Sequence, residues 1–194
     1  MNMLYNKLPE AISINGISYP INTDFRVWIR ASLLFENNAE NELDRLAEIA
    51  RICLKPCSGK PMPELGELVS ALIDFLLLGE QPRKPRQSAK KAAKKNNDIY
   101  SFEYDDKYIY AAFYGQYGID LTSVRLHWWV FKALFDGLCG EHKFCRITEY
   151  RATDVSKIKD SKQRAYIRKM QNIYRLPDNR TQDEKDADIA DALS

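Results

Sequence analysis

The most continuous apolar pattern in the chain runs over residues 124–138 and repeats at the spacing of a helix. On a 3.6-residue wheel its polar side chains Arg125, Lys132 and Asp136 form one narrow stripe, and Lys132 and Asp136 are spaced to pair. The other positions are almost all apolar, which predicts a helix at the centre of the core. Trp129 departs from this pattern because it falls on the polar stripe, where another segment covers it or a partner binds it.

Near the N-terminus, residues 12–21 alternate between apolar and polar positions, as in a β-hairpin. Asn15-Gly16 lies at the centre of this pattern and favours a type I′ turn, because both central residues of that turn need a positive φ. Pro20 cannot donate a ladder hydrogen bond, so the second strand ends there or lies at an edge.

Three helices are expected between this hairpin and Gly79. Thr23 is a plausible N-cap for the first helix. Residues 39–54 show one charged arc and one apolar arc, which is typical of a half-buried helix, and the apolar arc runs from Leu43 to Cys53. Residues 63–78 are apolar nearly all round, so we expect the first two helices to bury this third one.

Residues 80–98 contain seven basic side chains, and no acid lies between Arg83 and Asn97. Because the segment lacks large apolar residues it cannot form a core, and we expect a flexible basic linker. It is either a solvated spacer or a contact for nucleic acid or an acidic partner. No aromatic residue interleaves the lysines, so specific recognition of nucleic acid is not expected.

A second compact region is predicted over residues 99–177, where apolar and aromatic residues return at helical spacing. Within it, Asp160-Ser161-Lys162-Gln163 resembles a capping box and precedes an amphipathic helix with a basic outer face. Pro177 stops that helix, and residues 178–194 form an acidic tail that we expect to be mobile.

The predicted fold is therefore mainly α, similar to a helical bundle, with a short N-terminal β-hairpin. Four regions follow from the composition: a hairpin with three helices (1–79), the basic linker (80–98), an aromatic-rich helical region (99–177) and the acidic tail (178–194). With 45% hydrophobic residues the chain can bury a substantial core. The linker either joins two lobes or crosses the surface of one.

The overall charge gives little indication of a partner, since the formal net charge is +2. No signal peptide or membrane-spanning run is recognisable, and we expect a cytosolic protein. Its four cysteines are then expected to be free thiols.

Signatures of catalysis are scarce. The sequence has no glycine-rich phosphate loop, no Gly-x-Ser-x-Gly elbow and no His-Glu-x-x-His motif. Only His127 and His142 could act as imidazole bases, and His127 lies on the apolar side of the central helix, as a core histidine does. We therefore expect neither enzymatic activity nor a cofactor.

Cysteine and histidine spacing offers one metal hypothesis. Cys139, His142 and Cys145 recur every three residues, and Cys53 with Cys57 could complete a zinc site. This spacing is not that of a standard zinc finger, and Cys53 also fits a core position on its helix. No metal site is therefore expected.

Several unusual aromatic strings occur in an order that resembles the phage "gene product fifteen" family of Gram-positive siphophages and prophages. The resemblance extends over roughly residues 12–177 and is most specific in the second half. It rests on YPINTDFR (19–26), YSFEY (100–104), YIYAAF (108–113), YGIDL (117–121), HWW (127–129), RATD (151–154) and KIKD (157–160).

This resemblance implies a phage tail morphogenesis protein that works in the host cytoplasm. Similar proteins are thought to be assembly chaperones or scaffolds that bind the tape measure protein and recruit tail-tube subunits, the major tail protein. The resemblance supplies no catalytic residues. Two alternatives stay open: a structural tail or connector component of the virion, and an accessory protein that binds nucleic acid through the basic arm. Self-association is also left open, and neither a membrane nor, in the leading interpretation, nucleic acid is expected as a partner.

Aromatic side chains are the candidates for a partner-binding surface, because a chaperone for a helical client would offer an apolar groove. Trp129 is the first candidate, since it interrupts the polar stripe of its helix. Tyr110 and Tyr114 on the preceding predicted helix come next, together with Trp128.

Overall fold

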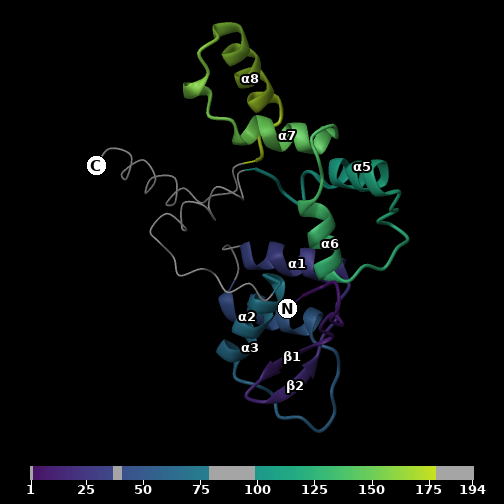
Figure 1. Cartoon of the computed structure of the whole chain (residues 1–194). Coiled ribbons are helices and arrows are strands. Elements are labelled where there is room, and N and C mark those ends of the chain that lie inside the picture. Colours follow the sequence, from purple (N-terminus) through teal and green to yellow (C-terminus); the bar gives the residue numbers. More distant parts are fainter. Residues whose placement is uncertain (1, 37–40, 79–98, 178–194) are drawn as a thin grey trace.

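The computed structural model describes residues 2–36, 41–78 and 99–177. The predictions for the basic linker and the acidic tail lie outside these residues. Within them the chain is mainly helical with one N-terminal hairpin, as predicted (Figure 1). The elements are β1 (Ala11–Ile14), β2 (Ile17–Pro20), α1 (Phe25–Glu36), α2 (Glu42–Cys53), α3 (Leu65–Leu76), α5 (Asp106–Tyr117), α6 (Trp128–Asp136), α7 (Lys143–Ala152), the 3₁₀ turn η1 (Val155–Lys157) and α8 (Ser161–Ile173).

The hairpin forms as the sequence predicts. Strands β1 and β2 pair antiparallel with Ile14 opposite Ile17, and Asn15 and Gly16 have φ values of 51° and 77°. Both positive values are those of a type I′ turn. Pro20 ends β2, and the inward-facing side chains of the hairpin pack on α3.

Helix α2 packs between α1 and α3, and α3 packs on the hairpin strand β1. The ends of these helices differ from the predicted ones. The Asp24 carboxylate, rather than Thr23, caps α1 by accepting a hydrogen bond from the Arg26 amide at 3.0 Å. Asn41 caps α2, which ends at Cys53. The predicted apolar arc of α2 is partly wrong, because Leu43 is 64% exposed. The helix turns Ile49 inward instead, where it contributes to the core.

The central apolar helix is shorter than its pattern indicates. Residues 124–127 are extended, and α6 begins at Trp128. The extended segment pairs with the chain that enters α1: Phe25 N–H donates to Leu126 O at 3.0 Å and Trp128 N–H to Thr23 O at 2.7 Å. These bonds between distant segments outweigh the local helical pattern. The predicted Lys132–Asp136 ion pair on α6 is confirmed.

In the second half, α5, α7 and α8 form successive contacts, α5 with α7 and α7 with α8. Asp160 caps α8 as predicted, with its carboxylate accepting from the Gln163 amide at 2.6 Å. Figure 1 shows α8 at one end of the molecule, beyond α7 and farthest from the hairpin. None of the residues of α8 is fully buried.

A single hydrophobic cluster extends through both halves of the described chain. It includes Ile12 of the hairpin, Trp28 of α1, Phe113 of α5 and Phe144 of α7. Helix α6 lies between the two halves and supplies Phe131, which is fully buried. Among the described helices, none has the length and apolar character needed to span a membrane.

Candidate partner-binding site

The two tryptophans proposed for a partner surface are core residues. Trp128 is 2% exposed and Trp129 5% exposed. Their indole N–H groups donate to the Leu76 and Phe75 carbonyls, both at 2.9 Å, at the end of α3. The idea that a partner binds Trp129 at an open surface is therefore wrong, since the last turn of α3 covers it.

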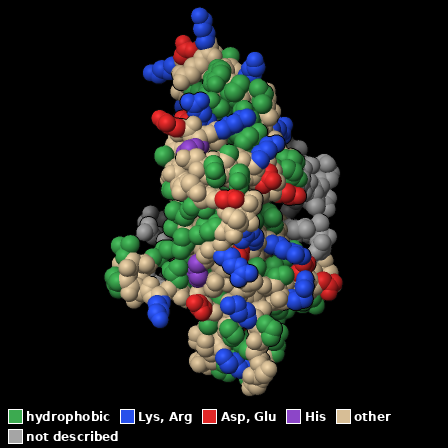
Figure 2. Space-filling view, turned by 90° about the vertical axis from the view of Figure 1, so that its right-hand side faces the viewer, with side chains coloured by type: hydrophobic (Ala, Val, Ile, Leu, Met, Phe, Trp, Pro, Cys, Tyr) green, Lys and Arg blue, Asp and Glu red, His purple; other side chains and the backbone are tan. Residues whose placement is uncertain are grey.

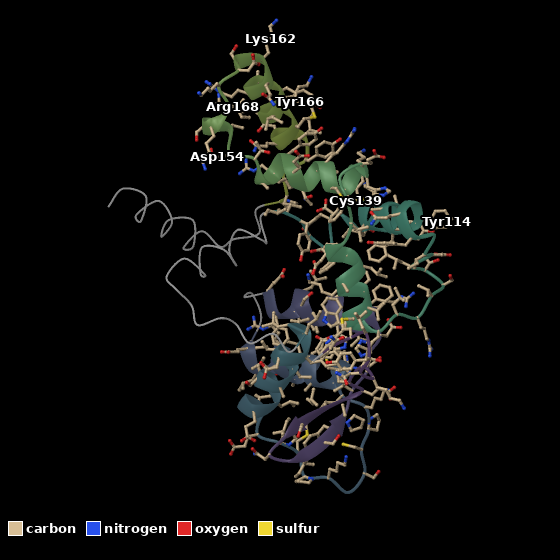
Figure 3. All side chains as sticks on the ribbon, viewed as in Figure 1. Tyr114, Cys139, Asp154, Lys162, Tyr166 and Arg168 are labelled. Carbon is tan, nitrogen blue, oxygen red and sulfur yellow. The ribbon has the colours of Figure 1, made fainter. Side chains whose placement is uncertain are left out.

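The two tyrosines lie closer to the surface. Tyr110 is half-buried, whereas Tyr114, one turn further along α5, is 58% exposed and points away from the body (Figure 3). Their rings stack with centroids 6.2 Å apart. Tyr110 lines a cavity to which Tyr114 does not contribute.

That cavity has a volume of about 520 Å³ and is bounded by α1, α5, α6 and the loop that leads to α6. Its apolar lining comes from Phe25, Ile29, Phe102, Ile109, Leu121 and Phe131, and its polar lining from Arg26, Asp106, Lys107, Tyr110 and Thr122. We call it the α1–α5 groove. Aromatic stacking fixes its floor, because the rings of Phe25 and Phe131 lie 4.6 Å apart and nearly parallel.

One arginine holds two sides of the α1–α5 groove together. The Arg26 guanidinium lies over the Phe25 ring, 4.5 Å from its centroid, and donates to the carbonyls of Leu121 and Val124. The loop before α6 is thereby fastened to α1. Arg26 also forms an ion pair with Asp24 at 3.3 Å, and this contact helps to orient the Arg26 side chain.

The polar edge of the groove carries a hydrogen-bonded acid. Thr122 donates its amide and hydroxyl hydrogens to the Asp120 carboxylate at 2.9 and 2.6 Å, and these bonds hold the pKa of Asp120 below its usual value. Partial desolvation, followed by the charge of Asp120, raises the pKa of Tyr110. The Tyr110 phenol therefore stays protonated at neutral pH and remains a hydrogen-bond donor at the edge of the groove.

Chemically, the α1–α5 groove suits apolar side chains bordered by polar groups. Its volume lies in the range of ligand-binding clefts, about 300 to 1,000 Å³. Cations from Arg26 and Lys107 and an anion from Asp106 stand at its rim, where they can fix the direction of a bound segment.

A buried ion pair organises the neighbouring half of the molecule. The Arg151 guanidinium donates to both carboxylate oxygens of Asp105, at 2.6 and 3.0 Å, and Asp105 is 1% exposed. Arg151 also donates to the carbonyls of Ile99 and Tyr174, at 3.0 and 2.6 Å. The Arg151 side chain thus connects the start of α5 to Ile99, which precedes α5, and to Tyr174, which follows α8.

The histidines and cysteines occupy structural positions. His127 caps α6: its Nδ1 accepts from the Trp129 amide at 3.1 Å, so Nε2 carries the hydrogen and donates to Pro9 O at 3.0 Å. The Cys139 thiol contacts the Gln116 side-chain oxygen at 3.5 Å. Within 2–36, 41–78 and 99–177 no group of three or more His, Cys, Asp or Glu residues is arranged to hold a metal. The four cysteines are free thiols.

Sequence reasoning found Tyr110 but missed most of the site around it. Arg26 and Ile29 of α1 lie about 80 to 95 residues before Tyr110 and Thr122 in the sequence, and no local pattern brings these residues together. No local sequence pattern distinguishes Asp105 from the neighbouring Asp106. The true partner of Asp105 belongs to the RATD string that contributed to the family resemblance, and that string was the one available signal.

Comparison with known proteins is consistent with the phage resemblance. Neither the curated proteins nor the solved structures contain a significant match to the chain. The family model described as Bacteriophage Gp15 protein matches residues 4–176, which cover both halves of the fold and all the residues of the α1–α5 groove. By this match over most of its length, the chain belongs to the bacteriophage Gp15 protein family.

Proposed function

We propose that this phage protein is a tail morphogenesis factor, an assembly chaperone or scaffold that binds the tape measure protein, tail-tube subunits or both in the host cytoplasm. The observation that supports this role best is the α1–α5 groove, an open apolar cavity of about 520 Å³ with a charged rim. Such a cavity can receive the apolar face of an amphipathic helix, and a tape measure protein would offer many such faces.

Binding rather than catalysis fits the chemistry of this surface. The groove presents aromatic and aliphatic side chains, and its one phenol is kept protonated. The most buried carboxylate of the described residues, Asp105, is engaged by Arg151 and does not line the α1–α5 groove. We therefore propose a protein without enzymatic activity.

Co-purification with the tape measure protein of the same phage tests the role. The two proteins are co-expressed, and the amount of tape measure protein retained by the tagged chain is measured. Thr122→Trp places a large ring at the mouth of the groove, and we expect it to reduce the retained client about tenfold, since it competes with the client for the groove.

Ser123→Trp is the matched control, because Ser123 is also exposed and also bonded to Asp120 but does not line the groove. On α5, Tyr110→Ala removes a side chain that lines the groove and should reduce the retained client. Tyr114→Ala is its control, because Tyr114 does not line the groove. Full retention by Thr122→Trp, or equal losses in both members of each pair, would contradict the groove as the client site.

Mass spectrometry of purified virions separates an assembly factor from a structural tail or connector component. An assembly factor is absent from the finished particle or present in traces. A stoichiometric amount of this chain in the virion would replace the chaperone proposal by the structural one.

A further inference from the structure

The end of the molecule formed by α7, η1 and α8 is strongly basic. Residues 143–175 contain ten basic side chains and three acidic ones, although the whole chain has a net charge of only +2. The remaining residues therefore carry an excess of acids. Figure 2 shows Lys and Arg side chains projecting from this end of the molecule.

Helix α8 turns its cations outward. Lys162, Arg168 and Lys169 are all exposed, whereas Arg164 turns inward and donates to the Ile158 carbonyl at 2.7 and 3.0 Å. Figure 3 shows Lys162 at the far end of the helix, with Arg168 and Tyr166 on opposite sides of it.

These three cations have no ion-pair partner among the acidic side chains that the structure describes. Two of the three acids of the same unit are engaged locally, since Asp154 caps η1 and pairs with Lys157 and Asp160 caps α8. The third, Glu149, is exposed on α7 and is not on α8. The positive potential of the face is therefore not neutralised by the described residues around it.

The centre of this face is also not apolar. Between Lys162 and Lys169 it carries Ala165, and it ends in Asn172, so it has no continuous stripe to bury in a protein groove. Two large side chains, Tyr166 and Ile173, lie at the edge of the face and are 50% and 57% exposed. The Tyr166 ring packs edge-on against Tyr150 of α7, and their phenol oxygens lie 3.2 Å apart.

We propose that the outward face of α8 binds nucleic acid through its phosphate backbone, without reading base sequence. Lys162 and Lys169 are seven residues apart, or about 10 Å along the axis at 1.5 Å per residue. That distance equals the axial rise of about three nucleotides in one DNA strand. A regular polyanion matches such an array of unpaired cations better than an acidic protein does, because its charges recur at a fixed spacing. This inference does not depend on the proposed chaperone role.

Fluorescence anisotropy of the full chain with a short labelled DNA duplex of mixed sequence, and with one of its strands alone, tests the proposal. We expect binding in the micromolar range or weaker at low salt. If three cations contact phosphates, affinity for the duplex should fall about 40-fold between about 50 and 200 mM salt. A change of base sequence should leave it unaltered.

The charge-reversed variant Lys162→Glu, Arg168→Glu, Lys169→Glu is expected to lose at least about tenfold in affinity. Its matched control reverses three exposed cations elsewhere, Lys7→Glu, Lys55→Glu and Arg125→Glu, with the same change in net charge. Circular dichroism verifies that each variant is folded, and the neutral Lys162→Gln, Arg168→Gln, Lys169→Gln set replaces the acidic one if α8 unwinds.

Three results would overturn the proposal. One is the absence of binding to either DNA form at low salt. Another is an equal loss in the α8 variant and its control, which would mean that only net charge matters. The third is displacement of the duplex by poly-glutamate at equal charge concentration, which would assign the face to an acidic protein.

Discussion

Arg151 shows how much of this fold depends on single side chains. Its guanidinium binds both oxygens of Asp105 and two carbonyls, from Ile99 and Tyr174. Only arginine has the fixed fork of donors that meets such a set, because lysine offers a single point charge. The Arg151 side chain therefore links the α7–α8 end of the molecule to α5, in addition to the direct packing of α7 on α5.

Replacing Arg151 by methionine should lower the free energy of unfolding by about 3 to 5 kcal/mol, since it leaves the buried Asp105 carboxylate without its partner. Chemical denaturation measures this change. Arg168→Met removes an exposed guanidinium from α8 and should alter stability by less than about 0.5 kcal/mol. Similar values for the two variants would show that the buried pair is not the main link.

Trp129→Ala should destabilise the fold by about 3 to 5 kcal/mol, because it leaves a cavity beneath α3 and removes the indole donor to Phe75 O. The same denaturation experiment detects the loss. Tyr114→Ala, at an exposed aromatic position, is the control and should have little effect. A stable Trp129→Ala protein that loses only its client would restore the surface role predicted from the sequence.

Contacts between individual residues were the hardest feature to predict from the sequence. The capping role of Asp160 was predictable because cap and helix are neighbours in the chain. The Asp105–Arg151 pair joins residues 46 positions apart, and periodicity contains no information on such a partner. The helical wheel placed Trp129 on the polar side of its helix. In the structure the end of α3 covers Trp129, and the wheel contains no information on that contact.

At the level of elements, local patterns predicted the type of each element better than its ends. The hairpin was predicted correctly because Asn15-Gly16 determines its own turn. The start of α6 was not, because residues 124–127 pair with the segment before α1. His127 then serves as the N-cap, a role that the pattern of the predicted longer helix excluded.

The turn at Asp120 makes this loop sensitive to acid. Hydrogen bonds from Thr122 lower the pKa of Asp120 in the folded protein, so its carboxylate stabilises the fold above the unfolded pKa. That contribution is lost as pH falls through the lower, folded pKa. An asparagine can accept the same bonds without titrating. The drop in unfolding temperature between pH 7 and about pH 3 should therefore be smaller in Asp120→Asn.

Asp154 provides an independent repeat of this measurement. Bonds from Ser156 lower its pKa in the same way at the start of η1, far from the groove. Asp154→Asn should also reduce the drop in unfolding temperature on acidification. In the double variant the reductions from Asp120→Asn and Asp154→Asn should add. If both variants lose as much stability in acid as the unsubstituted chain, these turns do not contribute to it.

On the scale of the whole molecule, composition and periodicity predicted a mainly α fold with a hairpin. They did not predict how the two helical regions are joined, which depends on contacts between residues far apart in the sequence. The hydrophobic cluster is continuous from Ile12 to Phe144, and the indoles of α6 bond to the end of α3. The α1–α5 groove exists only because these regions meet, so the sequence could not delineate it.

Cutting the chain between residues 80 and 98, at an inserted protease site, tests this shared core. We expect the two fragments to remain associated on gel filtration, since neither can bury its part of the cluster alone. Expression of residues 1–79 and of residues 99–194 separately should give poorly folded products. Two fragments that separate and stay folded would instead indicate independent lobes.

All three tryptophans are almost fully buried, and each indole N–H donates to a backbone carbonyl: Trp28 to Asn22, Trp128 to Leu76 and Trp129 to Phe75. The intrinsic fluorescence of the native chain should therefore be blue-shifted, and exposure to water on unfolding should shift it to the red. None of the three lines the α1–α5 groove or lies on α8. Emission from these indoles can thus follow folding in each variant described above that neither adds nor removes a tryptophan, and we expect ligand binding at either surface to leave the emission wavelength unchanged.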